Sequence, residues 1–202
     1  MKNVCIHPYL FAVALTLLGT LSGCEQRGGK HYQGYYPVDS IVTAQIHFLA
    51  STHASAVKVA KFGGKEETST IKPADSIGWI NELDIFRELK TLNKPINQGA
   101  YRVENDLPDN RSNLKIKSIA TQQSLPVRSM KIYYYDKPQK VKRIEAQFNE
   151  VNSLYSSERF LVMEFQDVDN KTVLSSYSID GGQKMFLGDT VTYSIKGTVV
   201  FQ

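Results

Sequence analysis

Apolar residues recur at steps of three and four between Val38 and Thr52, which predicts a helix with one buried face. Asp39 or Ser40 is available as its N-cap. The next apolar segments flank Gly63-Gly64, and glycine accepts the positive φ that a tight turn requires. A hairpin is therefore expected, with strands over 56–62 and 67–71.

A second helix is predicted from Asp75 or Ser76, either of which can cap it, to Asn93-Lys94-Pro95, where proline disfavours further helix. Asp84 and Glu88 lie four residues apart on its polar side, a spacing at which paired carboxylates can perform acid–base chemistry. Because Arg87 and Lys90 alternate with them, a solvated helix face is favoured. The apolar stripe consists of Trp79, Ile80, Leu83, Phe86 and Leu89.

From Gly99 onward the apolar pattern has a period of two, which is typical of strands with one buried face. Short connections rich in Gly, Asp and Pro imply antiparallel neighbours. The expected fold is therefore α+β: a curved antiparallel sheet, a meander of about eight strands, packed on two N-terminal helices. Strands are expected at 100–104, 114–120, 127–135, 141–149, 159–166, 172–179, 184–187 and 190–201, with turns at 136–138, 167–171, 180–182 and 188–189.

Composition is that of a globular domain, since 42% of the 202 residues are hydrophobic and 22% are charged. The net charge of +4 is too small to indicate a nucleic-acid partner. Cys5 and Cys24 are the only cysteines. Both belong to the N-terminal segment described next, so no thiol is left for a disulfide, a nucleophile or a zinc site.

The N-terminus has a basic start at Lys2, an apolar run and then Leu21-Ser22-Gly23-Cys24. This sequence resembles the lipobox of bacterial lipoproteins, in which the chain is cut before the Cys and that sulfur carries diacylglycerol. The resemblance implies a signal peptide over 1–23, an acylated Cys24, a flexible tether over 24–37 and one domain over 38–202. The protein would then be lipid-anchored in a bacterial cell envelope.

Two other interpretations of this segment remain open. A transmembrane anchor is disfavoured because the apolar run is interrupted at His7-Pro8 and is shorter than the roughly 20 residues a bilayer needs. A plain secreted protein is disfavoured by Cys24 at the lipobox position.

The residue after Cys24 is Glu25, and by the sorting convention of enterobacteria a residue other than Asp at this position permits passage to the outer membrane. Tyr32, Tyr35 and Tyr36 could enter the lipid interface or pack on the domain.

Two further resemblances concern the body of the chain. An antiparallel sheet around one or two helices is similar, in element order, to the half-barrel lipoproteins and lipoprotein carriers of the bacterial envelope. The chain also resembles uncharacterised lipoproteins of Bacteroidota, a likeness that assigns no activity. The stretches that carry it are Trp79–Pro95, Arg159–Phe165 and Ser176–Lys184.

One aromatic and basic segment is a candidate binding surface. Alternation sends Tyr133 and Tyr135 to one face of a strand, and Tyr134 to the other with Met130 and Ile132. Such a surface could bind an anionic glycan, a lipid headgroup or a protein partner. The alternative is a plain strand beside a soluble basic hairpin. The nearby cations are Lys131, Lys137, Lys140, Lys142 and Arg143.

No known catalytic motif is present, and neither a metal nor a cofactor is expected. His47 and His53 are six residues apart, so a helix would point them to different faces. The acidic run 167–170 lacks the Gly and distant Glu of a calcium loop, so a β-turn is favoured. Gly181-Gly182-Gln183-Lys184 could hold a phosphate only if a helix followed, and a strand is expected there.

These features favour a non-enzymatic binding or accessory module whose curved sheet offers a concave apolar face to a hydrophobic ligand or an envelope partner. A purely structural envelope lipoprotein without a pocket is the second hypothesis. An enzyme is the third, because catalytic residues on loops leave no pattern in one sequence. A cavity of at least a few hundred Å³ would favour the first hypothesis over the second.

Overall fold

The structure, a computed structural model, describes residues 34–201. It consists of one antiparallel sheet and two α-helices, which confirms the predicted α+β class. The helices are α2 (Val38–Ser51) and α3 (Ser76–Arg87), followed by two short 3₁₀ segments, η2 (Glu88–Asn93) and η3 (Pro95–Asn97). The strands are β1 (Ser55–Phe62), β2 (Lys65–Ile71), β3 (Arg102–Pro108), β4 (Lys115–Ala120), β5 (Val127–Tyr134), β6 (Val141–Val151), β7 (Tyr155–Val168), β8 (Lys171–Met185) and β9 (Thr190–Val200).

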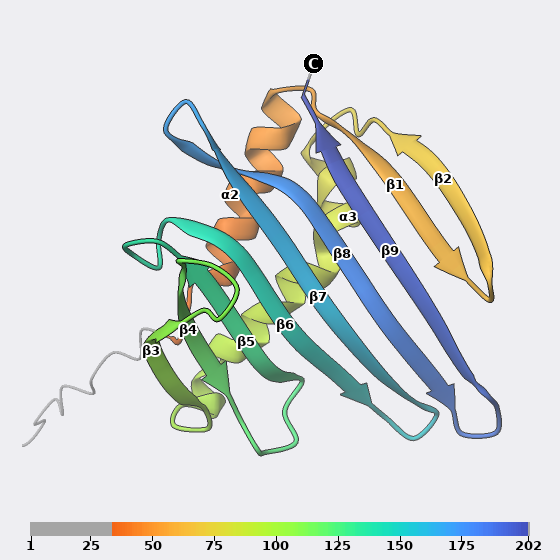
Figure 1. Ribbon diagram of the computed structural model, residues 1–202. Helices are drawn as coiled ribbons and strands as arrows, with labels where there is room; N and C mark the ends of the chain where they lie inside the picture. Colours follow the sequence, from red (N-terminus) through yellow and green to blue (C-terminus); the bar gives the residue numbers. More distant parts are fainter. Residues whose placement is uncertain (1–33, 202) are drawn as a thin grey trace, which may run out of the picture. The chain divides into compact units, whose positions relative to one another are not determined.

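All nine strands belong to one sheet in the order β2-β1-β9-β8-β7-β6-β5-β4-β3 (Figure 1). The strands from β3 to β9 form the predicted meander, in which each pairs with the next along the chain. The β1–β2 hairpin then adds to β9, with Ser55 opposite Val200. The sheet does not close, so β2 and β3 are its two edge strands.

Two hairpin turns follow the expected turn chemistry. Phe62 pairs with Lys65 across Gly63-Gly64, and both glycines have positive φ. Val168 pairs with Lys171 across Asp169-Asn170, two residues that also have positive φ, as a two-residue hairpin loop requires. The predicted turn is therefore present at Asp169-Asn170, whereas Asp167 and Val168 are the last residues of β7.

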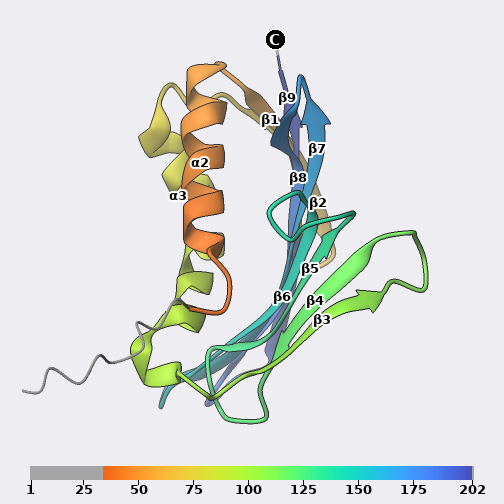
Figure 2. The same ribbon diagram turned by 90° about the vertical axis from the view of Figure 1, so that its left-hand side faces the viewer.

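Both helices lie on the same face of the sheet, which curves around them (Figure 2). Trp79, Leu83, Phe86 and Leu89 of the predicted stripe are fully buried there, while Ile80 is partly buried. Asp75 caps α3 by accepting a hydrogen bond of 3.0 Å from the Gly78 N–H. The concave face of the sheet is therefore covered by helices.

The predicted cap of the first helix is wrong. Pro37 is at the N-cap position of α2 without a side-chain hydrogen bond, and Asp39 and Ser40 lie inside the first turn. Proline carries a φ already suited to a helix start and has no N–H to satisfy, so the helix begins earlier. Asp39 instead faces Arg87 of α3 at 4.0 Å.

The predicted turn at 180–182 is also wrong, because β8 runs unbroken from Lys171 to Met185. Gly181 and Gly182 are strand residues opposite Tyr193 and Thr192 of β9. A Cβ on Gly181 would lie 2.7 Å from the Tyr193 ring, so this glycine makes room for an aromatic side chain on the neighbouring strand. The segments 172–179 and 184–187 are thus parts of one strand up to Met185.

Ordered packing begins before Val38. Tyr36 is buried, and Tyr35 packs edge-on against Tyr101, with ring centroids 5.0 Å apart. The Asn93 side chain accepts a hydrogen bond of 2.7 Å from the Tyr35 N–H. Tyr35 and Tyr36 therefore follow the second predicted alternative, packing on the domain. Tyr32, the predicted signal peptide, the lipobox and Cys24 lie outside the described residues.

Candidate functional site

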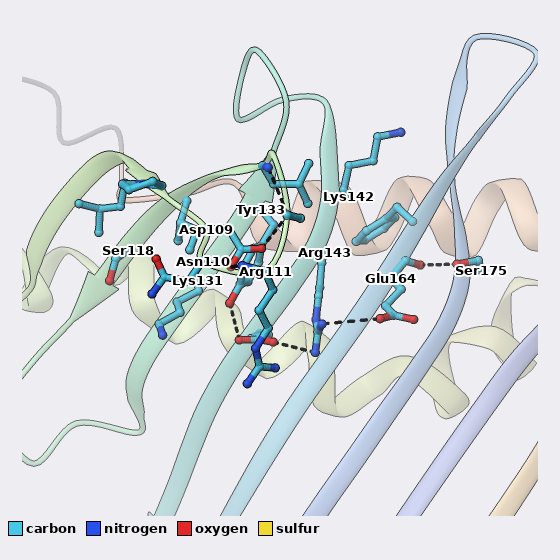
Figure 3. A pocket seen from close by; sticks show the side chains of 17 residues that line it. Asp109, Asn110, Arg111, Ser118, Lys131, Tyr133, Lys142, Arg143, Glu164 and Ser175 are labelled. Carbon is cyan, nitrogen blue, oxygen red and sulfur yellow. Dashed lines mark hydrogen bonds and ion pairs between the residues drawn. The ribbon is translucent and has the colours of Figure 1, made fainter.

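A pocket of about 810 Å³ opens on the face of the sheet that points away from the helices. The loop between β3 and β4 forms one wall, and side chains of β5, β6 and β7 form the floor (Figure 3). Its charged lining comprises four basic residues, Arg111, Lys131, Lys142 and Arg143, and three acidic residues, Asp109, Glu145 and Glu164.

Strand alternation divides the side chains of β5 between the two faces of the sheet. Met130, Ile132 and Tyr134 of β5 are fully buried on the helix-covered side. Lys131 and Tyr133 point to the opposite side and line the pocket. Register brings their cross-strand neighbours onto the same face, so Tyr133 lies opposite Arg143 of β6 and Arg143 lies opposite Glu164 of β7.

A chain of polar contacts crosses the pocket floor. The Tyr133 hydroxyl donates a hydrogen bond of 2.8 Å to Glu145, which also forms an ion pair of 2.8 Å with Arg143. Arg143 reaches Glu164 at 3.9 Å and lies over the Tyr133 ring, 5.8 Å from its centroid. Burial, followed by the hydrogen bond to Glu145, raises the pKa of Tyr133 to about 12. The hydroxyl is therefore a proton donor at neutral pH.

The β3–β4 loop is held in place by Asp109. Its carboxylate accepts hydrogen bonds from the Ser112 hydroxyl at 2.6 Å and from the Arg111 N–H at 3.3 Å. The Ser112 hydrogen bond is the main cause that lowers the pKa of Asp109, to which the charges of Arg111 and Arg143 add. A polar loop is thereby fixed beside the pocket, with the Arg111 side chain on the pocket side (Figure 3).

The charges of this pocket are unequally compensated. All three lining carboxylates have partners, because Asp109 and Glu145 are held as described and Glu164 accepts from the Ser176 hydroxyl at 2.9 Å. Among residues 34–201, by contrast, neither Arg111 nor Lys131 forms an ion pair. The buried Nε of Arg143 also has no hydrogen-bond partner within this part of the chain. The basic residues of the lining therefore outnumber the acidic ones by one, and two of them form no ion pair in the described part of the chain.

The five residues of the predicted binding surface are only partly brought together. Lys131, Tyr133, Lys142 and Arg143 line the pocket, whereas Tyr135 lies beyond it with 48% of its surface exposed. Lys142 connects the two places, since its ammonium group lies 5.7 Å from the centre of the Tyr135 ring. Lys142 is also paired with Asp167.

Sequence reasoning did not identify Asp109, Arg111, Glu145 and Glu164 as pocket residues. The polar run between Pro108 and Leu114 is a turn signal, but nothing in it says that the loop returns over the sheet. Glu145 follows Arg143 by two residues on β6, so strand alternation places the two on one face. Which residues of β5 and β7 lie beside them depends on strand register, which one sequence does not specify.

No described group of three or more His, Cys, Asp or Glu side chains could hold a metal ion. His47 is on α2, and His53 follows the helix with positive φ. Asp84 forms an ion pair of 3.7 Å with Arg87, as expected of a solvated helix face.

Within residues 34–201, no helix has both the length and the apolar character needed to cross a membrane. Comparisons with protein-family models, curated proteins and solved structures found no match.

Proposed function

We propose that this protein is a lipid-anchored binding module of a bacterial cell envelope, and that its pocket holds an anionic, polar ligand without catalysing a reaction. The observation that carries the proposal is a pair of cations, Arg111 and Lys131, that line a pocket of about 810 Å³ and have no ion-pair partner among the described residues. The lipobox resemblance at Leu21–Cys24 supports the anchor and the location.

The chemistry of the lining favours a polar ligand over a hydrophobic one. Seven charged side chains surround the pocket, and burying an apolar group against them would strip water from these charges. An anionic group would instead accept charge-assisted hydrogen bonds from Arg111 and Lys131. Anionic sugars and phosphate-bearing headgroups both have this chemistry.

The concave apolar face is a weaker candidate for a ligand site. Its side chains pack against α2 and α3, and the large residues Trp79, Phe86 and Tyr177 have almost no exposed surface. A hydrophobic ligand would have to displace a helix to reach them. The purely structural alternative remains, and it predicts that no small anion binds specifically.

The test uses the full chain, purified from bacterial membranes in detergent, and three probes: inorganic phosphate, glycerol 3-phosphate and galacturonate. Binding is measured as a rise in the thermal unfolding midpoint and by calorimetric titration. At least one probe should bind, and Arg111→Ala/Lys131→Ala should weaken its binding about tenfold or more, because a hydrogen bond to a charged group contributes about 1.5–3 kcal/mol.

The matched control is Lys65→Ala/Lys90→Ala, which removes the same charge from exposed positions outside the pocket lining. This control should bind the probe as the parent does. Equal weakening in both double variants would mean that only net charge matters and would contradict the pocket. Failure of all three probes to bind the parent would favour the structural alternative.

A further inference from the structure

Exposed apolar side chains gather at one end of the sheet, on the loops β6–β7 and β8–β9. The two loops are joined by a backbone hydrogen bond of 2.9 Å from the Phe186 N–H to the Leu154 carbonyl. Leu154, Phe186 and Leu187 are 68%, 81% and 92% exposed, and their neighbours Val151 and Met185 are also exposed. These five residues form the apolar tip of the sheet.

Single exposed apolar residues are ordinary on protein surfaces, but a continuous group is not. The segments 151–154 and 185–188 contain no charged residue. The loops at the other end of the same strands differ: the β5–β6 connection contains Asp136, Lys137 and Lys140, and the β7–β8 turn contains Asp169. The apolar tip is therefore a property of one end of the sheet.

The chain enters the domain facing this same end. Ser55 follows α2 closely and pairs with Val200, the last residue of β9. The C-terminal end of α2 therefore lies near the end of the strands that is opposite the apolar tip. Gly34, the first described residue, lies against Asn93, and Thr91 lines a hollow together with Val151 of the apolar tip. Gly34 follows the proposed anchor, Cys24, by ten residue steps. At about 3.3–3.6 Å per residue they can reach about 33–36 Å.

We propose that the apolar tip inserts into the interfacial layer of the bilayer that holds the lipid anchor. This inference rests on the lipid anchoring in the proposed function. A bilayer accepts protruding Phe and Leu side chains without a complementary groove and without charged partners. The long axis of the sheet then stands on the membrane, with a second attachment besides Cys24.

Fluorescence can locate the tip, because Trp79 is the only tryptophan and is fully buried, so its emission gives a constant background. The full chain carrying Phe186→Trp is reconstituted into phosphatidylethanolamine–phosphatidylglycerol vesicles with or without brominated acyl chains, which quench nearby tryptophan. The control is Val168→Trp, 43% exposed at the far end of β7. Brominated chains should reduce the added emission at least about twofold at position 186 and leave that at 168 unchanged.

Each other outcome contradicts the inference in a distinguishable way. In one outcome, the protein floats with the vesicles while bromine quenches neither the tryptophan at position 186 nor that of a second variant, Leu187→Trp. That result would agree with the anchor and overturn the insertion of the tip. A blue shift that depends on protein concentration and not on bromine would indicate a second copy at the tip. A chain that does not float with the vesicles would overturn the anchor and the docking together.

Discussion

Gly197 of β9 shows how one missing side chain lets the helices pack on the sheet. A Cβ at this position would lie 2.0 Å from Cζ of Tyr177, whose ring covers the glycine. Tyr177 packs edge-on against Phe86 and donates a hydrogen bond of 2.7 Å to Glu82, which also binds Lys58 of β1. Burial raises the pKa of the Tyr177 hydroxyl, which stays a donor to Glu82. The ring therefore has little freedom to move aside.

The substitution Gly197→Ala should lower the free energy of unfolding by about 1–3 kcal/mol, because overpacking forces the ring or the strand to shift. Chemical denaturation of the full chain in detergent measures it. Gly182→Ala is the matched control in β8, where a new Cβ would meet its nearest atom at 3.7 Å. A control that loses as much stability as Gly197→Ala would show that the loss is not caused by the Tyr177 contact.

At the scale of elements, helix α2 is attached to the sheet at an irregularity of β8. Register shifts between Glu164 and Phe165 of β7, which leaves one extra residue, Ser175, in β8. Gln45 of α2 fills the hydrogen-bonding positions near this bulge. Its amide accepts from the Leu174 N–H at 2.7 Å and donates to the Thr172 carbonyl at 2.9 Å. A buried side chain thus takes the place of a strand partner.

Replacing this amide should be costly. Gln45→Leu keeps the volume but leaves the Leu174 N–H and the Thr172 carbonyl without their partner, and each orphaned buried group costs about 1–3 kcal/mol. The unfolding midpoint in denaturant should fall accordingly. Gln123→Leu, at an exposed loop position, should change stability by less than about 0.5 kcal/mol. Unchanged stability in Gln45→Leu would mean that water replaces the amide.

The same elements show what local patterns can predict. Helices α2 and α3 and most strands follow from apolar period, because burial of one face dictates which positions are apolar. Gly63-Gly64 and Gly181-Gly182 look alike in sequence, yet the first pair forms a turn and the second lies within β8. The difference lies in Tyr193 on another strand, so only tertiary contact decides it.

The pocket could be predicted only in part. Strand alternation predicts that Tyr133 and Lys131 share a face. The places of Glu145, Glu164 and Arg111 beside them depend on strand register and on the path of the β3–β4 loop, which the sequence pattern does not specify.

At the scale of the molecule, the pocket and the apolar tip lie at different ends of β6. Arg143 is near the start of this strand and Val151 is its last residue. Val151 follows Arg143 by eight residue steps, a rise of about 26 Å at about 3.3 Å per residue. With the apolar tip in the bilayer, as proposed, the pocket would be held clear of the lipid surface and open to soluble or cell-wall ligands.

The anchor itself is tested by Cys24→Ser. The parent, grown with labelled palmitate, should incorporate the label, lose residues 1–23 and remain with membranes. The variant should incorporate no label and keep its leader, because a hydroxyl cannot form the thioether that precedes cleavage. Acyl labelling and the mass of the N-terminal peptide measure both. An unlabelled parent with an intact or differently trimmed leader would contradict the lipoprotein interpretation.

The two unpaired edges of the sheet matter most for a protein that is concentrated on a surface. Crowded sheets can recruit one another through free backbone groups and grow into fibrils. Here β2 begins with Lys65-Glu66-Glu67, and β3 carries Arg102 and Glu104 and is interrupted by a bulge before Pro108. Charges and an irregular backbone discourage addition of a tenth strand, which would keep many copies on one membrane, as proposed, from aggregating.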